Sequence, residues 1–184
     1  DGLTADEIAG IGELSESELK KIAETKENLL DDLTKEFAAQ GINVTVNRTT
    51  GELAMDASVL FGGDSSVITD AGKTLLNKFI KAYTTIAYNE KYSGFISKTL
   101  VEGHTAPVSG STYESGLPLS EQRANNVKDY CLSSDTGVDT SKLTTTLEAV
   151  GLSNSKPVYG TNGKIDMAAC RRVSFRFIVN IDKQ

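Results

Sequence analysis

The 184-residue sequence has no tryptophan, one histidine, two cysteines and three prolines. Two cysteines cannot support a disulfide scaffold. A chain of this length buries roughly 70% of its unfolded surface, so we expect one compact domain plus an appendage, with an ordinary hydrophobic core. Long apolar runs are also missing, whereas a membrane-spanning helix needs about 20 consecutive apolar residues. No signal-like segment opens the sequence, which indicates a mature or trimmed soluble fragment.

Basic residues are fewer than acidic ones, 19 against 25, and the lysines and arginines form no cluster. Nucleic-acid binding through phosphate neutralisation, and attachment to a membrane surface through a basic helix, both need such a cluster. We therefore expect neither kind of partner. The acidity lies in residues 1–40, which hold 11 acidic and 4 basic residues, while residues 41–184 are nearly neutral. This asymmetry predicts an acidic helical leader over 1–40 and a globular domain over 41–184.

The sequence also lacks the short motifs of common enzyme classes. It has no glycine-rich phosphate loop followed by lysine, no His-Glu-x-x-His, no Cys-x-x-Cys and no Gly-x-Ser-x-Gly. A catalytic triad or a zinc site would depend on His104, the single histidine, and a lone histidine at a strand end is more often structural. We expect a non-catalytic protein without a metal or another cofactor.

Helical signals begin in the leader. Ser15 with Glu18 has the pattern of a capping box, and apolar residues recur at helical spacing behind it, which predicts a helix over 16–39. Thr4 and Glu7 have the same spacing and indicate a short helical turn before it. The apolar face of the long helix needs a partner, so the helix either covers the sheet of its own domain or contacts a second copy of the chain.

Two more helices are predicted in the globular domain. After a loop over 62–66, Thr69 can cap a helix whose apolar residues keep one face. After a second loop, rich in proline, serine and glycine, Ser120 can cap another helix, whose inward face begins at Ala124.

Strand signals have a period of two. They predict a hairpin over 42–56, a short strand over 96–102, and a strand within 143–151, where the residue types also allow a helix. The last segment, 173–181, alternates most clearly and predicts a strand with one buried face. The order of these elements predicts an α+β fold, a two-layer sandwich of a mixed sheet with helices on one face, plus the N-terminal helix.

One constellation of residues favours a binding site. Gly103, His104 and Thr105 end a predicted strand, so backbone amides and a hydroxyl group lie at the end of the sheet. Arg123 follows in the first turn of the helix that Ser120 caps. There its guanidinium and the free backbone N–H groups of the helix N-terminus would both attract an anion. Together these groups predict a small anion site that suits a carboxylate.

Five short pieces of the sequence occur in an order typical of one family. They are Val59-Leu60-Phe61, Ile68-Thr69-Asp70-Ala71-Gly72, Gly103-His104-Thr105, Leu119-Ser120-x-x-Arg123-Ala124 and Arg171-Arg172-Val173. In this respect the sequence, from about Ile42 to Ile181, resembles the OmpA-like domain family, which includes the C-terminal domain of OmpA, Pal lipoproteins and MotB-type stator subunits. The resemblance implies the family's βαβαβ-type mixed sheet.

The resemblance also implies non-covalent binding of the peptidoglycan stem peptide. The family grips the end of diaminopimelate, which carries an ammonium and a carboxylate on one carbon. An aspartate directly after Gly-His-Thr binds the ammonium, and the arginine of Leu-Ser-x-x-Arg-Ala binds the carboxylate. By position the arginine is Arg123, whereas the aspartate position holds Ala106, so the diaminopimelate site is altered. Glu114, on a stretch that is slightly longer than usual, is our hypothesis for a replacement acid.

Two pairs of residues leave alternatives open. Of Arg171 and Arg172, one is expected to pair with an acid across the sheet and the other to reach the ligand, and we include Arg172 among the ligand-binding residues. Cys131 and Cys170 are either two small buried residues or, in an oxidising compartment, a disulfide.

A protein of this family is expected in the periplasm or cell wall, with any membrane anchor in a segment that this chain lacks. The leader helix also allows a homodimer. The alternative to a wall anchor is a scaffold or self-association module, for example in a stator-type assembly, that kept the fold and lost peptidoglycan binding. Ala106 is the residue that favours this alternative.

Overall fold

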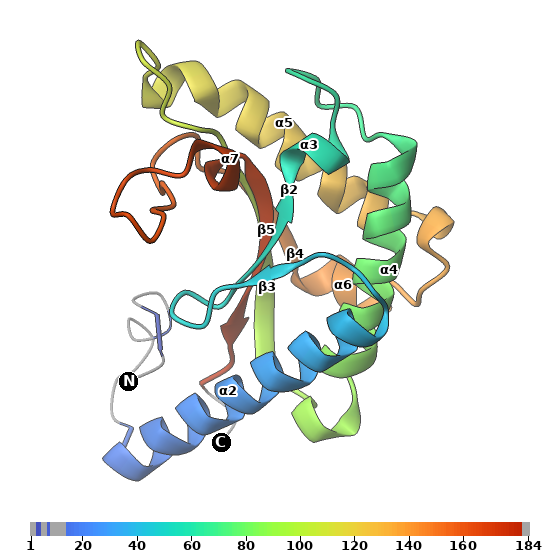
Figure 1. The fold of residues 1–184 in the computed structure, drawn as a ribbon. Coiled ribbons are helices and arrows are strands. Elements are labelled where there is room, and N and C mark those ends of the chain that lie inside the picture. The colour runs from blue at the N-terminus through green and yellow to red at the C-terminus, as the bar shows by residue number, and fades with distance from the viewer. Residues whose placement is uncertain (1–2, 5–6, 8–13, 182–184) are drawn as a thin grey trace.

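A mixed five-stranded sheet forms the middle of the molecule in the computed structural model, which describes residues 3–4, 7 and 14–181. The strand order is β1-β2-β5-β3-β4 (Figure 1); β3 and β4 are parallel, whereas the other neighbours are antiparallel. The strands are β1 (Thr45–Val46), β2 (Glu52–Asp56), β3 (Ile96–His104), β4 (Leu147–Gly151) and β5 (Arg172–Val179). This confirms the predicted α+β fold, and the predicted hairpin is the β1–β2 pair.

Three long helices and several short ones accompany the sheet. The long helices are α2 (Glu16–Ala39), α4 (Asp70–Ala87) and α5 (Tyr113–Leu132). The short helices are α3 (Ala57–Leu60), α6 (Ser141–Thr146) and α7 (Met167–Cys170), with single turns η1 (Glu90–Tyr92) and η2 (Ser134–Thr136) in the connections. Figure 1 shows α4 and α5 on one side of the sheet and the loop into α7 on the other. Within the described residues, none of the helices has the length and apolar character needed to cross a membrane.

An aromatic stack joins the leader helix to the rest of the core. The ring of Phe79 on α4 lies 5.3 Å from the ring of Phe37 on α2 and 4.6 Å from the ring of Phe175 on β5, measured between centroids. Leu29 and Leu33 of α2 are fully buried in the same core. The leader helix therefore covers the core of its own domain, which is the first of the two predicted alternatives. The boundary at residue 40 stays a prediction.

Local capping explains where two of the helices begin. Ser15 and Glu18 form the expected capping box, and the helix runs over 16–39 as predicted. Thr69 caps α4 through a hydrogen bond of 2.9 Å that its hydroxyl accepts from the N–H of Gly72. Each cap satisfies backbone N–H groups that have no partner inside the helix.

The start of α5 differs from the prediction. The helix begins at Tyr113, and Ser120 lies inside it. Thr112 is the cap, because its hydroxyl accepts the N–H of Ser115 at 3.1 Å and the Ser115 hydroxyl accepts the N–H of Thr112 at 2.9 Å. This reciprocal pair nucleates the helix two turns early, and the helix runs on through Pro118, which the sequence places in a loop.

A buried ion pair fixes the N-terminal segment to the domain. The Glu7 carboxylate accepts a hydrogen bond from the ammonium of Lys26 on α2 at 2.9 Å and another from the backbone N–H of Thr4 at 2.7 Å. The side chains of Glu7 and Lys26 are almost fully buried. The other carboxylate oxygen accepts the N–H of Val179 at the end of β5, at 3.4 Å. The predicted pairing of Thr4 with Glu7 is confirmed, and most of the remaining segment lies outside the described residues.

Both faces of β5 are buried, so the prediction of a single buried face is wrong. Phe175 and its neighbours on one face pack against the helices. Arg172, Ser174 and Arg176 on the other face are also buried, because the arginines pair with carboxylates from neighbouring strands. The ambiguous segment 143–151 is divided: its first part belongs to α6 and its second part is β4.

Candidate ligand-binding site

The end of β3 lies directly against α5. A Cβ atom at Gly103 would overlap the backbone carbonyl of Ser120, so only glycine lets the helix approach this closely. A Cβ atom at Gly116 would lie 2.5 Å from the hydroxyl oxygen of Ser153 and 2.7 Å from that of Thr105. The backbone N–H of Thr105 donates to the carbonyl of Ser153 at 2.8 Å. The structure thus brings three of the predicted site residues, Gly103, Thr105 and Ser120, together.

Arg123 lies one turn further along α5 and is only 6% exposed. Its Nε donates to the carbonyl of Ser65 at 2.9 Å and its Nη2 to the carbonyl of Gly63 at 2.6 Å. The guanidinium also lies 4.8 Å from the centre of the Phe61 ring. Arg123 therefore holds the 62–66 loop, which the sequence predicts as a loop without indicating this contact.

The positive charge of Arg123 is only partly balanced by the groups around it. Within the described residues no carboxylate oxygen lies within 4 Å of its guanidinium, and its close polar partners are neutral carbonyl groups. Burial lowers the pKa of Arg123, and the more distant charge of Asp64 opposes this shift. A largely buried cation without a carboxylate is costly, and an anion that enters the site relieves that cost.

The predicted acidic side of the site holds no buried charge. Ala106, at the position where the family has aspartate, is an apolar residue with 6% exposure. Glu114 lies exposed in the first turn of α5 and forms no ion pair within the described part of the chain. Its role as a replacement acid stays a prediction.

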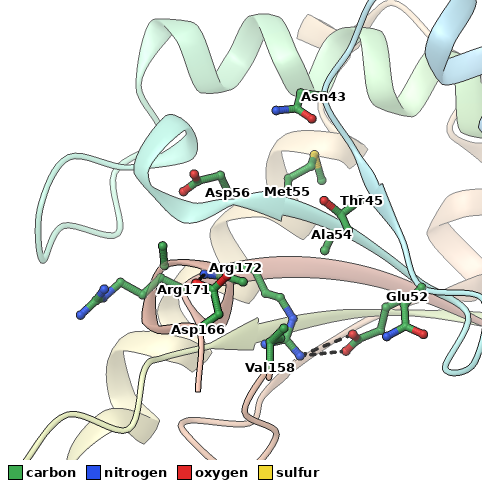
Figure 2. A pocket seen from close by; sticks show the side chains of 13 residues that line it. Asn43, Thr45, Glu52, Ala54, Met55, Asp56, Val158, Asp166, Arg171 and Arg172 are labelled. Carbon is green, nitrogen blue, oxygen red and sulfur yellow. Dashed lines mark hydrogen bonds and ion pairs between the residues drawn. The ribbon is translucent and has the colours of Figure 1, made fainter. Parts of the chain in front are cut away.

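A pocket lies between β2 and the loop that leads into α7, and we call it the α7 pocket. Its volume is about 260 Å³, and Asp56, Asp166 and Arg171 border it (Figure 2). Glu52 and Arg172 line its inner end, where the dashed lines of Figure 2 mark their contact. The sequence does not predict this pocket, because its walls are about a hundred residues apart along the chain.

Arg172 is the structural member of the arginine pair. Its Nη2 donates to both carboxylate oxygens of Glu52, at 3.2 and 3.4 Å, and its Nη1 donates to the carbonyls of Lys156 and Cys170. This confirms that one arginine pairs with an acid across the sheet. The ligand contact assigned to Arg172 stays a prediction, while the Arg171 side chain is exposed.

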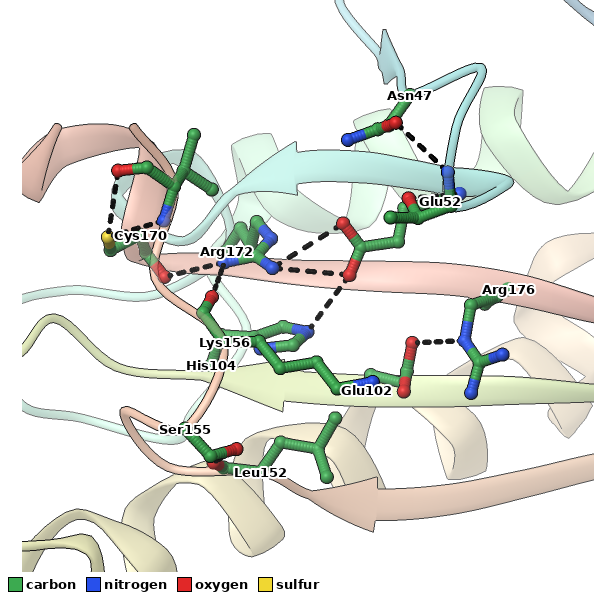
Figure 3. A network of polar contacts seen from close by, with 12 residues as sticks. Asn47, Glu52, Glu102, His104, Leu152, Ser155, Lys156, Cys170, Arg172 and Arg176 are labelled. Carbon is green, nitrogen blue, oxygen red and sulfur yellow. Dashed lines mark hydrogen bonds and ion pairs between the residues drawn. The ribbon is translucent and has the colours of Figure 1, made fainter. Parts of the chain in front are cut away.

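His104 belongs to the same network and not to the surface that faces α5 (Figure 3). Successive residues of a strand point to opposite faces, so Gly103 faces α5 and His104 faces away. Its Nε2 lies 3.6 Å from a carboxylate oxygen of Glu52, which is too long for a hydrogen bond. Burial, and then the positive charge of Arg172, lower the pKa of His104 to about 3. The imidazole is therefore neutral, and this contact is not an ion pair.

The donors in this network could in principle hold a metal ion. One ligand atom each from Glu52, Glu102 and His104 lie within 4.8 Å of one another. However, Glu52 already accepts a hydrogen bond from Arg172, and Glu102 accepts one from Nε of Arg176 at 3.0 Å. A divalent cation here would lie beside two guanidinium groups, so the cluster fits a buried ion network better than a metal centre.

The two cysteines are free and fully buried. Burial raises the pKa of the Cys131 thiol to about 12, which keeps it protonated. The Sγ atom of Cys170 accepts the N–H of Val158 at 3.2 Å. The alternative of two small buried residues is confirmed, and the possible disulfide between Cys131 and Cys170 is wrong.

The comparisons with known proteins define the class. The model of the OmpA family matches residues 60–171, more than half of the chain, so the chain belongs to the OmpA family. It is 26% identical over 185 residues to Zorya protein ZorB of Escherichia coli (strain Crooks), which covers 93% of this chain and 78% of ZorB.

The fold is shared with solved structures, of which two are described by their similarity to this chain. A MotB-like protein from Desulfovibrio vulgaris has a TM-score of 0.62 at 17% identity, covering 88% of this chain and 95% of that protein. The cell wall anchor of the T6SS from Pseudomonas aeruginosa has a TM-score of 0.53 at 22% identity, covering 83% and 97%. At these identities the likeness shows the fold alone.

Proposed function

We propose that this chain attaches non-covalently to peptidoglycan and that Arg123 binds a carboxylate of the stem peptide. It acts as a binding module without catalysis, in the periplasm or cell wall. Membership of the OmpA family and the shared fold with a cell wall anchor support this proposal.

The observation that carries the proposal is the state of Arg123. Its guanidinium is almost buried and fixed by the carbonyls of Gly63 and Ser65, yet no carboxylate of the described residues neutralises it. These two hydrogen bonds leave other N–H groups of the Arg123 guanidinium free to donate to a further acceptor. Charge-assisted bonds to a carboxylate are the strongest that such a group forms.

The residues at the end of β3 position this arginine. Gly103 lets α5 lie against the strand, and Ser120 forms the contact, one turn before Arg123. Ala106 changes the ligand requirement, because a desolvated ammonium would find no counter-charge at that position. We propose an altered site that holds the carboxylate firmly and contributes little to ammonium binding.

Co-sedimentation with purified sacculi tests this function. We expect Arg123→Gln to weaken binding at least tenfold, because it removes a charge-assisted hydrogen bond worth about 1.5–3 kcal/mol. We expect Ala106→Asp to strengthen binding to sacculi of the diaminopimelate type, because it restores the counter-charge for the ammonium.

Lys128→Gln is the matched control, since it removes one positive charge from the same helix. Equal binding by the wild type and Arg123→Gln, with both variants folded by circular dichroism, would contradict the proposal. If the wild type does not bind but Ala106→Asp does, the chain is a scaffold or self-association module whose ligand site has lapsed.

A further inference from the structure

The 62–66 loop, which follows α3, lies on α5 and is held there by three side chains of that helix (Figure 1). Arg123 donates two hydrogen bonds to carbonyl groups of the loop, at 2.6 and 2.9 Å. Asn126 donates to the carbonyl of Ser66 at 2.8 Å, and Gln122 accepts a longer hydrogen bond of 3.4 Å from the hydroxyl of the same serine. These contacts close the loop over Arg123.

The guanidinium of Arg123 is covered from two sides, and the residue is 6% exposed. On one side the ring centre of Phe61 lies 4.8 Å from the guanidinium carbon. Phe61 is 1% exposed and belongs to the hydrophobic core, so this cover is fixed. The second cover is the 62–66 loop, whose carbonyls accept hydrogen bonds from Nε and Nη2. A carboxylate therefore gains full access to this cation only when the loop moves.

The loop has a fixed base and a free middle. Phe61 and Ile68 form an antiparallel bridge, which keeps the two ends together. Gly62 and Gly63 follow directly after the bridge, and a Cβ atom at either position would lie in open space. Gly63 has a φ of +53°, in the left-handed region that favours glycine. Lids open at a few residues that absorb the change in φ and ψ, and two adjacent glycines beside a fixed bridge suit that role.

The energetics favour replacement of the loop by an anion. In the closed state the hydrogen bonds of Arg123 run to neutral carbonyls. Asp64, in the middle of the loop, supplies a more distant negative charge that opposes the lowering of the Arg123 pKa. A carboxylate in direct contact forms charge-assisted hydrogen bonds, which are roughly twice as strong as bonds between neutral groups. The closed loop is thus a weak internal substitute for an anionic ligand.

We propose that the 62–66 loop is a lid that occupies Arg123 in the free protein and opens when a ligand carboxylate binds the guanidinium in its place. The lid competes with the ligand, so the measured affinity is lower than that of the open site by the fraction of molecules that are open. This inference rests on the proposed function, because it takes Arg123 as the group that binds the carboxylate. It adds an autoinhibitory contact to that site.

Asn126→Ala tests the lid without changing Arg123. The substitution removes the hydrogen bond to Ser66 and places a good helix former in α5. Asn125→Ala is the matched control, because Asn125 is also exposed and donates to the carbonyl of Glu121 in its own helix. In calorimetric titration with a stem tripeptide that ends in diaminopimelate, we expect Asn126→Ala to bind about threefold to tenfold more tightly, as the loss of one net hydrogen bond of the lid implies. We expect no change for Asn125→Ala.

Hydrogen exchange measures the lid in the absence of any ligand. The Nε–H of Arg123 donates to the carbonyl of Ser65 in the closed state, so its exchange with solvent deuterium requires the loop to open. Nitrogen-15 NMR follows this signal. We expect slow exchange in the wild type and in Asn125→Ala, and exchange about threefold to tenfold faster in Asn126→Ala.

The two measurements separate failure of the lid from failure of the proposed function. Faster exchange together with tighter binding in Asn126→Ala supports the lid. If the wild type binds the tripeptide and Arg123→Gln weakens that binding, but Asn126→Ala binds no more tightly, the lid is overturned and the proposed function stands. Tighter binding without faster exchange also overturns the lid. If neither the wild type nor Asn126→Ala binds, the proposed function fails, and the competition between lid and ligand fails with it.

Discussion

Glu52→Gln is expected to lower the free energy of unfolding by at least about 3 kcal/mol. Glu52 is 7% exposed and accepts both hydrogen bonds from Nη2 of Arg172, which is 6% exposed. Glutamine keeps the size of the side chain and removes its charge. A buried guanidinium is then left without a counter-charge, and this is the situation in which breaking an ion pair is most costly. Urea unfolding monitored by circular dichroism measures the effect.

The control for this change is Glu148→Gln. Glu148 is largely exposed and contacts Lys98 at 3.4 Å, so its loss should change the free energy of unfolding by less than about 0.5 kcal/mol. Equal effects of the two substitutions would show that the Glu52–Arg172 pair does not hold β2 to β5.

Lowering the pH from 7 to 5 is expected to reduce the stability of the wild type by about 2 kcal/mol through His104 alone. Burial and the charge of Arg172 lower the pKa of His104 from 6.5 to about 3 in the folded protein. Between these values the unfolded chain holds a proton that the folded chain does not. The part of the stability that depends on His104 is therefore greatest above pH 6.5 and falls as the pH drops toward 3, by about 1.4 kcal/mol for each unit.

Unfolding curves at pH 7, 6 and 5 for the wild type and His104→Gln measure this effect. His104 is the single histidine of the chain, so the comparison isolates one imidazole over this interval. We expect His104→Gln to lose much less stability over the same range. Parallel pH dependence in the two proteins would mean that His104 is accessible to protons in the folded state.

Elements governed by neighbouring residues could be predicted from the sequence. The helix over 16–39 follows from its capping box and its apolar spacing, and both signals lie within the segment. The start of α5 was missed although its signal is also local. Gly116 and Pro118 favour a loop on composition, whereas the reciprocal hydrogen bonds of Thr112 and Ser115 decide the outcome.

Features that depend on distant contacts could not be predicted. The alternation in the last strand gives its period correctly but makes Arg176 look solvent-exposed. Arg176 is buried together with Glu102 of the neighbouring strand, and no local pattern indicates that pairing. For Arg172 the sequence predicts an acid across the sheet but does not identify it as Glu52. In the same way the sequence identifies Arg123 as a cation of the site, but its contact with the 62–66 loop spans about sixty positions.

The most direct test of the account follows Arg123 itself by nitrogen-15 NMR during titration with a diaminopimelate-containing stem peptide. We expect the side-chain Nε–H signal of Arg123 and the backbone amide signals of Gly63 and Ser65 to shift together and saturate, because the carboxylate binds the guanidinium that holds this loop. Binding that leaves the Arg123 signal unmoved, or no binding at all, would contradict the claim that this arginine attaches the chain to the wall.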